Sequence, residues 1–581
     1  MSSLLMVVAI GLPWVVMVYS PPLNAVVNES MAAIGWGLLI IGLGWRNNSL
    51  FQKPATDAYI PVFLLAGLGL MALVHFLGGH IPYPALLFTY WAYLVGAALV
   101  FQYGVRLSVD RVSLLKIADV FCVVLLIAAV LNLVYGLYQY WNPVGNYPWI
   151  AALTDAGRIY GNTRQPNHYA SLMLLGLGSA LWLYFERHKL SLYVTVGLSL
   201  LLIAGVALSG SRTGIVGVLF VASAVLLLKW GSTTKIRLSI AACLVLTLIL
   251  FYVMLAALNE TGLRPHFGSE RLQQLQGDVS GSRFRAWTTS WEMILQNVWT
   301  GVGIGRFQFH YLLGEWSQQQ GQHFAHAHNL FLHLAAENGL IFATGFLVAL
   351  FYYGFKYIKI SWHASETKLV IVFIGPLLIH SFFEFPFWYT FFLFPTFFLM
   401  GILSGISAQT DKGPEIAPRG RLLAIGGLFM VLFSVVFMWS QRSGAAMYEK
   451  TDKTPIAERV ILAQNSFLLR HYADHALLVT SPPEIAYSKQ TTPIYSAVAQ
   501  VLFDQQLAYH WTLQSLANGN LEQAKRLSYA IYFMSPELFE ELKKTVQRAV
   551  EVETVGAREL ADYLNNPVPV NYKLEQFLSA Q

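Results

Sequence analysis

Long apolar runs are the feature that most constrains how this chain can fold. About thirteen stretches approach the ~20 residues that a helix needs to cross the hydrocarbon core of a bilayer. Of the 581 residues, 56% are hydrophobic and only 12% are charged, which excludes an ordinary water-soluble fold. We therefore expect an all-α integral membrane protein. The predicted spans cover residues 3–20, 31–45, 58–79, 84–103, 116–139, 168–186, 190–208, 213–229, 238–257, 329–353, 368–381, 386–406 and 422–440.

The distribution of lysine predicts the orientation of these spans. Alternate linkers, of which 104–116, 229–237 and 354–368 are examples, are rich in lysine and arginine, and such loops stay in the cytoplasm. The first run lacks a charged region and a cleavage site, so we expect it to be retained, with the amino terminus inside. The opposite loops contain no lysine up to about residue 440. Their only cationic residues are Arg158, Arg164, Arg212, Arg264, Arg271, Arg283, Arg285 and Arg306.

An all-arginine surface has a chemical interpretation. Guanidinium presents a planar fork of donors that fits two phosphate oxygens, whereas lysine is a point charge. The alternative is that these arginines only reach towards lipid headgroups. Arg212 lies in the turn Ser209-Gly-Ser-Arg-Thr-Gly214 between two spans, where a helix amino terminus favours an anion. A purely structural turn is the competing interpretation there.

Two predicted outer loops, 140–167 and 258–328, exceed the length of ordinary connections, and loops of that length are usually functional. The first loop is rich in amide side chains and hydrogen-bond donors where it joins the next predicted span. The second carries an Arg-x-Arg pair and a histidine cluster. The residues of interest are Asn162, Arg164, Gln165 and His168 in and just after the first loop, and Arg283, Arg285, His323, His326 and His328 in the second.

His328 directly precedes a predicted helix. A helix amino terminus disfavours imidazolium, so we expect a neutral ring that can act as a general base. Interfacial packing is one alternative. A metal site is another, and its candidate ligands are His323, His326, His328, His310 and His333. No carboxylate or cysteine is near them in the sequence, so we predict that no metal is bound.

A glutamate also lies within an outer aromatic segment, His380-Ser-Phe-Phe-Glu384-Phe-Pro-Phe-Trp-Tyr389. The aromatic residues alone would form an interfacial belt. A carboxylate such as that of Glu384 is not expected in such a belt. It could orient a basic group or bind sugar hydroxyls.

The composition changes at about residue 441, after which no run is long enough to span a bilayer. Residues 1–440 are the predicted transmembrane domain, and residues 441–581 a soluble helical domain on the same side as the arginines. Apolar residues at helical spacing predict helices over 455–469, 494–516, 520–534 and 536–563. Ser535-Pro536 is typical of a capped helix start. Such a domain could bind a protein.

Several motifs together resemble the bacterial O-antigen ligase and protein O-oligosaccharyltransferase superfamily. They are Ser-Gly-Ser-Arg212-Thr-Gly, Arg283-x-x-x-Trp287 followed by Gly-Val-Gly-x-Gly, and His328-Asn329 followed by Glu337-Asn-Gly-Leu340. They cover roughly residues 200–345. The segment Arg158–His168, the region around Glu384 and the soluble tail are similar to the pilin-glycosylating branch of that superfamily.

The resemblance implies transfer of a preassembled glycan from a polyprenyl diphosphate to a hydroxyl of an exported protein such as a pilin. The reaction would occur on the periplasmic side of a bacterial inner membrane, without metal, nucleotide or other cofactor. The sequence agrees in having no Asp-x-Asp pair and no phosphate-binding loop. The implied catalytic residues are Arg212, Arg283 and His328. The residues implied to hold the donor or acceptor are Asn162, Arg164, Gln165, His168, Arg285, His326, His380 and Glu384.

Three alternatives remain at this stage. An O-antigen ligase or polymerase would share these motifs and differ in its acceptor. A transporter of lipid-linked or anionic solutes could also line a cavity with arginine. A non-catalytic scaffold would bind partners through the tail. Nucleic acid is not an expected partner, because most of the net charge of +6 lies in the cytoplasmic loops.

Overall fold

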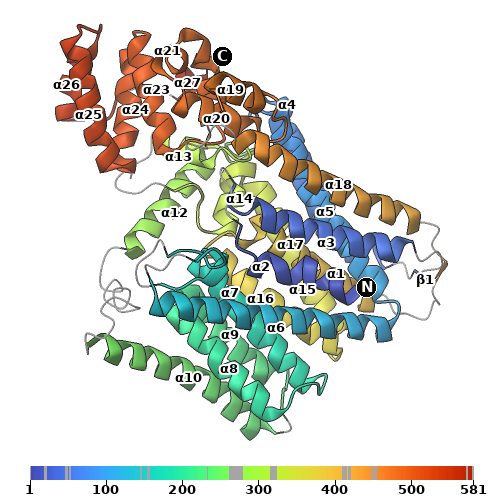
Figure 1. Cartoon of the computed structure of the whole chain (residues 1–581). Helices are drawn as coiled ribbons and strands as arrows, with labels where there is room; N and C mark the ends of the chain where they lie inside the picture. The colour runs from blue at the N-terminus through green and yellow to red at the C-terminus, as the bar shows by residue number, and fades with distance from the viewer. Residues whose placement is uncertain are drawn as a thin grey trace.

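The computed structural model is almost entirely helical (Figure 1). It describes the chain except for residues 1, 19–22, 46–49, 52–53, 144–146, 154–157, 232, 261–278, 315–323, 408–414, 417–419, 446–447, 449–453, 571–573 and 579–581. Within the described residues, the strands are two short segments, β1 (Leu50–Phe51) and β2 (Glu415–Ile416), which pair antiparallel. The prediction of an all-α fold is confirmed for the described chain apart from this pair.

A helix occupies each of the predicted spans. The membrane helices are α1 (Ser2–Met6) and α2 (Leu12–Val15), joined by a π-helical turn, then α3 (Val26–Gly44), α4 (Ile60–Leu77), α5 (Pro84–Leu107), α6 (Arg111–Trp141), α7 (Pro166–Phe185), α8 (Leu192–Leu208), α9 (Arg212–Leu227), α10 (Thr234–Glu260), α15 (Leu340–Ile360), α16 (Ser365–Ser381), α17 (Thr390–Ser407) and α18 (Gly420–Ala445). Among the described residues, nine helices are long and apolar enough to cross a bilayer, so the chain is a multi-pass membrane protein. The full count of thirteen stays a prediction.

Helix α7 is the centre of the bundle, because nearly all of its side chains are buried. Helices α6, α8, α9 and α16 pack around it. Helix α3 lies along α18, and α17 lies along α5, so segments distant in sequence form the second half of the bundle (Figure 1). The residues that precede α7 and α9 are therefore held at one end of a rigid core.

The structure differs from the sequence prediction at residues 329–353. The expected single span is two helices, α14 (Leu330–Asn338) and α15, which meet at Gly339. Gly339 has φ +88°, and a Cβ there would lie 2.3 Å from the carbonyl oxygen of Trp299. Only glycine tolerates both the left-handed backbone and this close approach. The chain breaks here because the loop around Trp299 packs against it, and α14 stays with the outer loops.

The two ends of the bundle differ in their side-chain chemistry. The end predicted to face the cytoplasm carries ion pairs between helices, with Arg187 Nε 2.7 Å from Asp119 and Lys368 Nζ 2.6 Å from Glu186. At the other end, α12 (Val279–Gln296), α13 (Phe307–Leu313) and α14 share one apolar cluster with the tail helices. The described helices of the second long loop and the tail thus lie on the same side of the bundle (Figure 1).

The tail follows the predicted helices with two extra breaks. It contains α19 (Ile456–Gln464), α20 (Arg470–Thr480), α21 (Pro483–Ala486), α22 (Thr492–Ala499), α23 (Gln505–Ala517), α24 (Leu521–Met534), α25 (Pro536–Glu551), α26 (Ala557–Asn565) and α27 (Leu574–Leu578). The predicted helix 494–516 divides where Asp504 caps α23, and 536–563 divides at Gly556. The capped start at Ser535 is confirmed, since its Oγ accepts from the Leu538 N–H at 3.3 Å. The domain boundary at residue 441 stays a prediction.

Candidate functional site

The carboxylate of Glu384 is the meeting point of three segments. It lies between α16 and α17 with a side chain only 8% exposed. Its Oε1 is 3.3 Å from Nη2 of Arg283 on α12, and its Oε2 is 3.2 Å from Nδ1 of His328, just before α14. The fold therefore brings together an arginine, a carboxylate and a histidine that are far apart in sequence.

A chain of hydrogen bonds extends this group to the amino terminus of α9. Asn167 Nδ2, in the first turn of α7, donates to Glu384 Oε1 at 3.1 Å. Ser211 Oγ donates to Asn167 Oδ1 at 2.6 Å and accepts from the Gly214 N–H at 3.1 Å. Ser211 is the N-cap of α9, and Arg212 is the first residue of that helix. The position of Arg212 is thus tied to Glu384 through two side chains.

The electrostatics of the site favour an anion. Burial raises the pKa of Glu384, but the contacts with His328 and Arg283 outweigh burial, so its pKa lies below the usual value. Burial and the positive charge of Arg212 lower the pKa of Arg283, whereas Glu384 raises it. Arg212 makes no ion pair with any acid among the described residues. Of the two arginines, only Arg283 pairs with the Glu384 carboxylate, so the charge of the nearby Arg212 is left unbalanced within the described residues.

The backbone holds His328 in an unusual conformation. Its φ is +49°, and Asn329 follows as the N-cap of α14, with Oδ1 accepting from the Leu332 N–H at 3.1 Å. The His328 N–H donates to Nδ1 of His326 at 3.3 Å, and the His326 ring lies against Phe385 with centroids 3.6 Å apart. The ring of His328 is 19% exposed, so it can meet a ligand.

Part of this group could also hold a metal ion. Ligand atoms of His326, His328 and Glu384 lie within 4.8 Å of one another. The sequence argument that no carboxylate is close to the histidines was wrong, because the fold supplies Glu384 from another segment. However, this carboxylate already contacts Arg283, and a guanidinium beside a divalent cation is electrostatically unfavourable. His323 lies outside the described residues, as do Arg264 and Arg271.

The side chains of Asn162 and Gln165 form hydrogen bonds with backbone groups of the protein. The Asn162 side chain donates to the carbonyls of Val15 and Trp149 at 2.7 and 2.8 Å and accepts from the Ala151 N–H at 3.0 Å. Gln165 Oε1 accepts from the His168 N–H at 2.6 Å and caps α7. We therefore no longer count Asn162 among the ligand-binding candidates. Gln165 keeps a free amide nitrogen within the described chain.

The histidines His168 and His380 are buried behind the site. His380 is fully buried and its Nδ1 lies 2.8 Å from Ser171 Oγ. The His168 ring packs edge-on against Tyr389, with centroids 4.8 Å apart. Nε2 of His380 is buried without a hydrogen-bond partner among the described residues, and a contact of either ring with donor or acceptor stays a prediction.

Of the two remaining predicted site arginines, Arg164 contacts the amino-terminal part of the chain. Its Nη1 donates to the Asn24 carbonyl at 2.8 Å, which ties the end of the first loop to the segment before α3. Arg285 lies on α12, two residues after Arg283, with a partly exposed side chain. Arg285 stays a predicted ligand, although side chains two residues apart on a helix face different directions.

Sequence reasoning missed three residues that connect the site. Asn167 and Ser211 join α7 and α9 to Glu384, as described above, and Arg158 Nε donates to the Ser209 carbonyl at 3.0 Å, beside the turn that leads to Arg212. All three lie inside motifs that attract attention in the sequence. Their spacing alone could not say which side chain faces which.

Three family models match parts of this chain. Residues 197–347 match the O-antigen ligase family, and residues 159–184 match the protein glycosylation ligase family. Residues 369–549 match a family described as virulence factor membrane-bound polymerase, C-terminal. The three ranges together contain Asn167, Ser211, Arg283, His328 and Glu384.

Two proteins of Acinetobacter baylyi are similar to this chain. One, a general O-oligosaccharyltransferase, is 27% identical over 357 residues, which is 60% of this chain and 61% of the relative. The other, a ComP-specific O-oligosaccharyltransferase, is 28% identical over 302 residues, covering 52% of this chain and 53% of the relative. The matches thus span about half to three fifths of these relatives.

Proposed function

We propose that this chain, which resembles the bacterial O-oligosaccharyltransferases of the O-antigen ligase superfamily, is a glycosyltransferase of the inner membrane. It would move a preassembled oligosaccharide from a polyprenyl diphosphate to a serine or threonine hydroxyl of an exported protein, on the periplasmic face. The observation that carries this proposal is the Arg283–Glu384–His328 group with Arg212 held beside it.

The diphosphate leaving group fits the positive end of the site. Arg283 uses one nitrogen for Glu384, and the rest of its donors stay available for phosphate oxygens. Arg212 supplies a second guanidinium and lies at the amino terminus of α9, where the helix dipole also favours negative charge. Negative charge grows on the diphosphate as the glycosidic bond breaks, so these donors stabilise the transition state more than the substrate.

His328 is the proposed base. A proton on Nδ1 pointing at Glu384 leaves the Nε2 lone pair free to take the proton of the acceptor hydroxyl. The hydroxyl oxygen then forms a bond to the anomeric carbon, and the bond from that carbon to the phosphate oxygen breaks. The polyprenyl diphosphate departs with the electron pair, and His328 returns its proton to water. One displacement predicts inversion of the anomeric centre.

The test is transfer by purified protein in liposomes. Arg212→Ala, Arg283→Ala and His328→Ala should each abolish transfer of a labelled glycan to a pilin-like acceptor. The matched control is Arg548→Ala, which removes an exposed arginine of the tail. Transfer at the wild-type rate by any of the three site variants would refute the assigned role.

A polymerase or ligase is the second candidate, because residues 369–549 match the membrane-bound polymerase family. Offering a pilin, a lipid A core and a free glycan acceptor together, with mass spectrometry of the products, separates the three outcomes. Metal dependence is tested in the same assay. Full activity in EDTA is expected, and a loss that zinc reverses would assign His326, His328 and Glu384 to a metal instead.

A further inference from the structure

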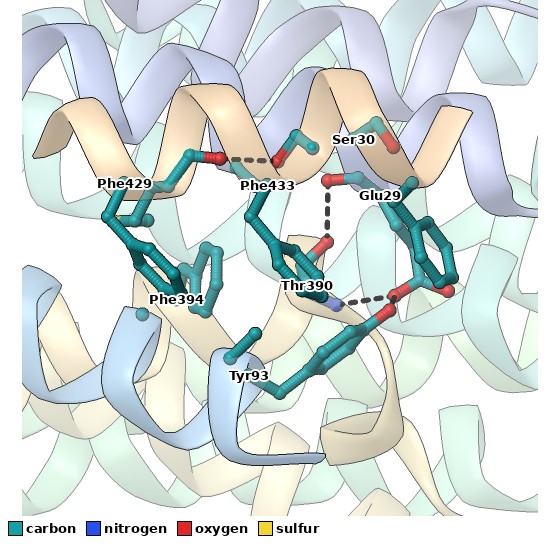
Figure 2. Close-up of a pocket in the computed structure, with 13 residues that line it drawn as sticks. Glu29, Ser30, Tyr93, Thr390, Phe394, Phe429 and Phe433 are labelled. Atoms are coloured by element: carbon teal, nitrogen blue, oxygen red, sulfur yellow. Dashed lines mark hydrogen bonds between the residues drawn. The ribbon is translucent and has the colours of Figure 1, made fainter. Parts of the chain in front are cut away.

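Arg306 is a buried cation whose guanidinium has no partner within the described chain. It directly precedes α13, and only 3% of its surface is exposed. Its Nε is buried without a hydrogen-bond partner, and no acid among the described residues offsets its charge. By contrast, the carboxylate of Glu29 between the membrane helices accepts from the Tyr93 hydroxyl and from the Thr390 N–H (Figure 2). A charge removed from water without a partner is costly, so an anion beside Arg306 would stabilise this arrangement.

His80 is a second group of this kind, and it lies beside Arg306. Its Nδ1 is enclosed and lacks a hydrogen-bond partner among the described residues. A Cβ at Gly303 would lie 3.1 Å from Cδ of Arg306 and 3.3 Å from Nδ1 of His80. Gly303 has φ +103°, which favours glycine, and its missing side chain leaves a space that both groups border.

Contacts with α4 hold these two groups in place. His75, in the last turn of α4, has Nε2 2.9 Å from the Thr300 carbonyl, and its Nδ1 accepts from the Ile304 N–H at 3.2 Å. Because Nδ1 is the acceptor, the proton of this ring is on Nε2 and the ring is neutral. The His80 ring stacks on His75 with centroids 5.8 Å apart. The loop before α13 is thus fixed to the end of a membrane helix.

The electrostatics around Arg306 also favour an anion. Burial lowers the pKa of Arg306 to about 10, so the guanidinium is still charged at neutral pH. Burial, and then the charge of Arg306, lower the pKa of His80 to about 4 and that of His310 to about 3. Glu337 accepts from the Gly305 N–H at 3.0 Å, but burial raises its pKa to about 8, so it is largely protonated at neutral pH. A bound anion would supply the negative charge that the protein lacks here.

Phosphate oxygens fit these donors. A guanidinium offers a planar fork of N–H groups that matches two phosphate oxygens, and an imidazole offers one more donor. The ring centroid of Phe309 lies 5.8 Å from the guanidinium carbon of Arg306, but an aromatic face carries no net charge and cannot replace an anion. Gly79 and Gly305, the sequence neighbours of the two groups, are exposed, and a Cβ at either would meet nothing within 4 Å. A ligand can therefore approach past these turns.

We propose that Arg306 and His80 form a second phosphate site, which does not depend on the proposed function. Within the described residues, neither of them contacts the carboxylate of Glu384 or its partners. The phosphate is either that of a lipid headgroup or free in solution. A headgroup could reach the site from the bilayer, because α4 is a membrane helix and Leu77, in its last turn, is 75% exposed.

Binding of radiolabelled inorganic phosphate to the purified full-length protein tests the first source. The background is Arg212→Ala with Arg283→Ala, which removes the phosphate donors of the proposed catalytic group. This background should still bind phosphate, and adding Arg306→Met should weaken binding at least about tenfold. Adding Arg548→Met, which removes an exposed arginine of the tail, should change nothing. Equal phosphate binding with and without Arg306→Met would exclude a free phosphate at this site.

Native mass spectrometry of the same proteins, released from nanodiscs of phosphatidylglycerol, tests the second source. A retained lipid that Arg306→Met loses would assign the site to a headgroup. Phosphate binding without a retained lipid would assign it to a soluble phosphate. If Arg306→Met changes neither measurement, no phosphate binds at this site and the inference is wrong.

His80→Phe keeps the test valid if Arg306→Met does not fold. Phenylalanine keeps a ring that can stack on His75 but removes both nitrogens, so binding of phosphate or lipid should weaken about three- to tenfold. His363→Phe, at an exposed histidine, is the matched control. Wild-type binding of both phosphate and lipid by a folded His80→Phe variant would overturn the assignment of His80.

Discussion

Glu384→Gln is the most discriminating single change in the site. The amide has nearly the shape of the carboxylate, and its oxygen can still accept from Asn167 and Arg283 at the Oε1 position. The atom that faces Nδ1 of His328 becomes an NH2 donor instead of an acceptor. Two donors cannot share a hydrogen bond, so the imidazole must carry its proton on Nε2. That tautomer cannot accept the proton of the acceptor hydroxyl.

The expected loss follows from that one contact. A hydrogen bond to a charged group contributes about 1.5–3 kcal/mol, which is roughly 10- to 150-fold in rate at about 1.4 kcal/mol per tenfold. The equivalent carboxylate-to-amide exchange in a serine protease triad lowers kcat about 10⁴-fold because it selects the wrong tautomer. We therefore expect Glu384→Gln to lower kcat by about 10²- to 10⁴-fold, with a smaller change in donor KM.

The assay is transfer of a fluorescent lipid-linked glycan in liposomes, with thermal unfolding measured on the same samples. Glu484→Gln, which neutralises an exposed glutamate of the tail, is the control for loss of charge. A variant that stays folded and keeps more than about a third of the wild-type kcat would refute the argument that Glu384 sets the tautomer of His328.

Three further predictions concern Arg212, the contact between the tail and α13, and the buried Glu337. Arg212→Lys should keep the positive charge but lose the pair of N–H donors that can bind two phosphate oxygens. Its kcat should therefore fall about tenfold, whereas the kcat of Arg212→Ala should fall 10²-fold or more. Equal activity of the two variants would refute a bidentate contact. Arg526 Nη2 donates to the Leu312 and Gly314 carbonyls at 3.3 and 3.1 Å, so Arg526→Met should lower the unfolding temperature, and a wild-type melting curve would contradict this. Burial raises the pKa of Glu337 from 4.5 to about 8, so the folded state holds a proton that the unfolded state has released, and stability falls as pH rises between those values. Glu337→Gln should therefore melt above wild type at pH 8.5 and near it at pH 5, and a constant difference would exclude titration of Glu337.

The membrane helices were predictable because their signal is local. A run of apolar residues specifies a span whatever the rest of the chain does. The break at Gly339 was not predictable in that way, because it depends on the loop at Trp299 lying 2.3 Å from where a side chain would be. The mean hydropathy of a window of consecutive residues cannot detect a contact between segments forty residues apart.

The candidate site was predictable only as a set of residue types. Arginines, a histidine and a glutamate stood out because charge is costly near a membrane. The sequence could not distinguish Asn167, which contacts Glu384, from Asn162, whose amide satisfies buried backbone groups. Both are asparagines in one motif, and both must be hydrogen-bonded when buried. Only the packing of α6 and α7 decides which of them faces the site.

The hydrogen bonds from Glu384 through Asn167 to Ser211 also determine which catalytic residues are disturbed when one linking side chain is substituted. Each link has one donor and one acceptor in a fixed direction, ending at the N–H groups of α9. Loss of the Asn167 amide would remove the acceptor of the Ser211 hydroxyl and one donor to Glu384, so the surroundings of Arg212 and Arg283 would be disturbed together. Asn167→Ala combined with Ser211→Ala should therefore lower kcat little more than Asn167→Ala alone. Additive losses would mean that α7 and α9 are positioned independently, by helix packing and not by these side chains.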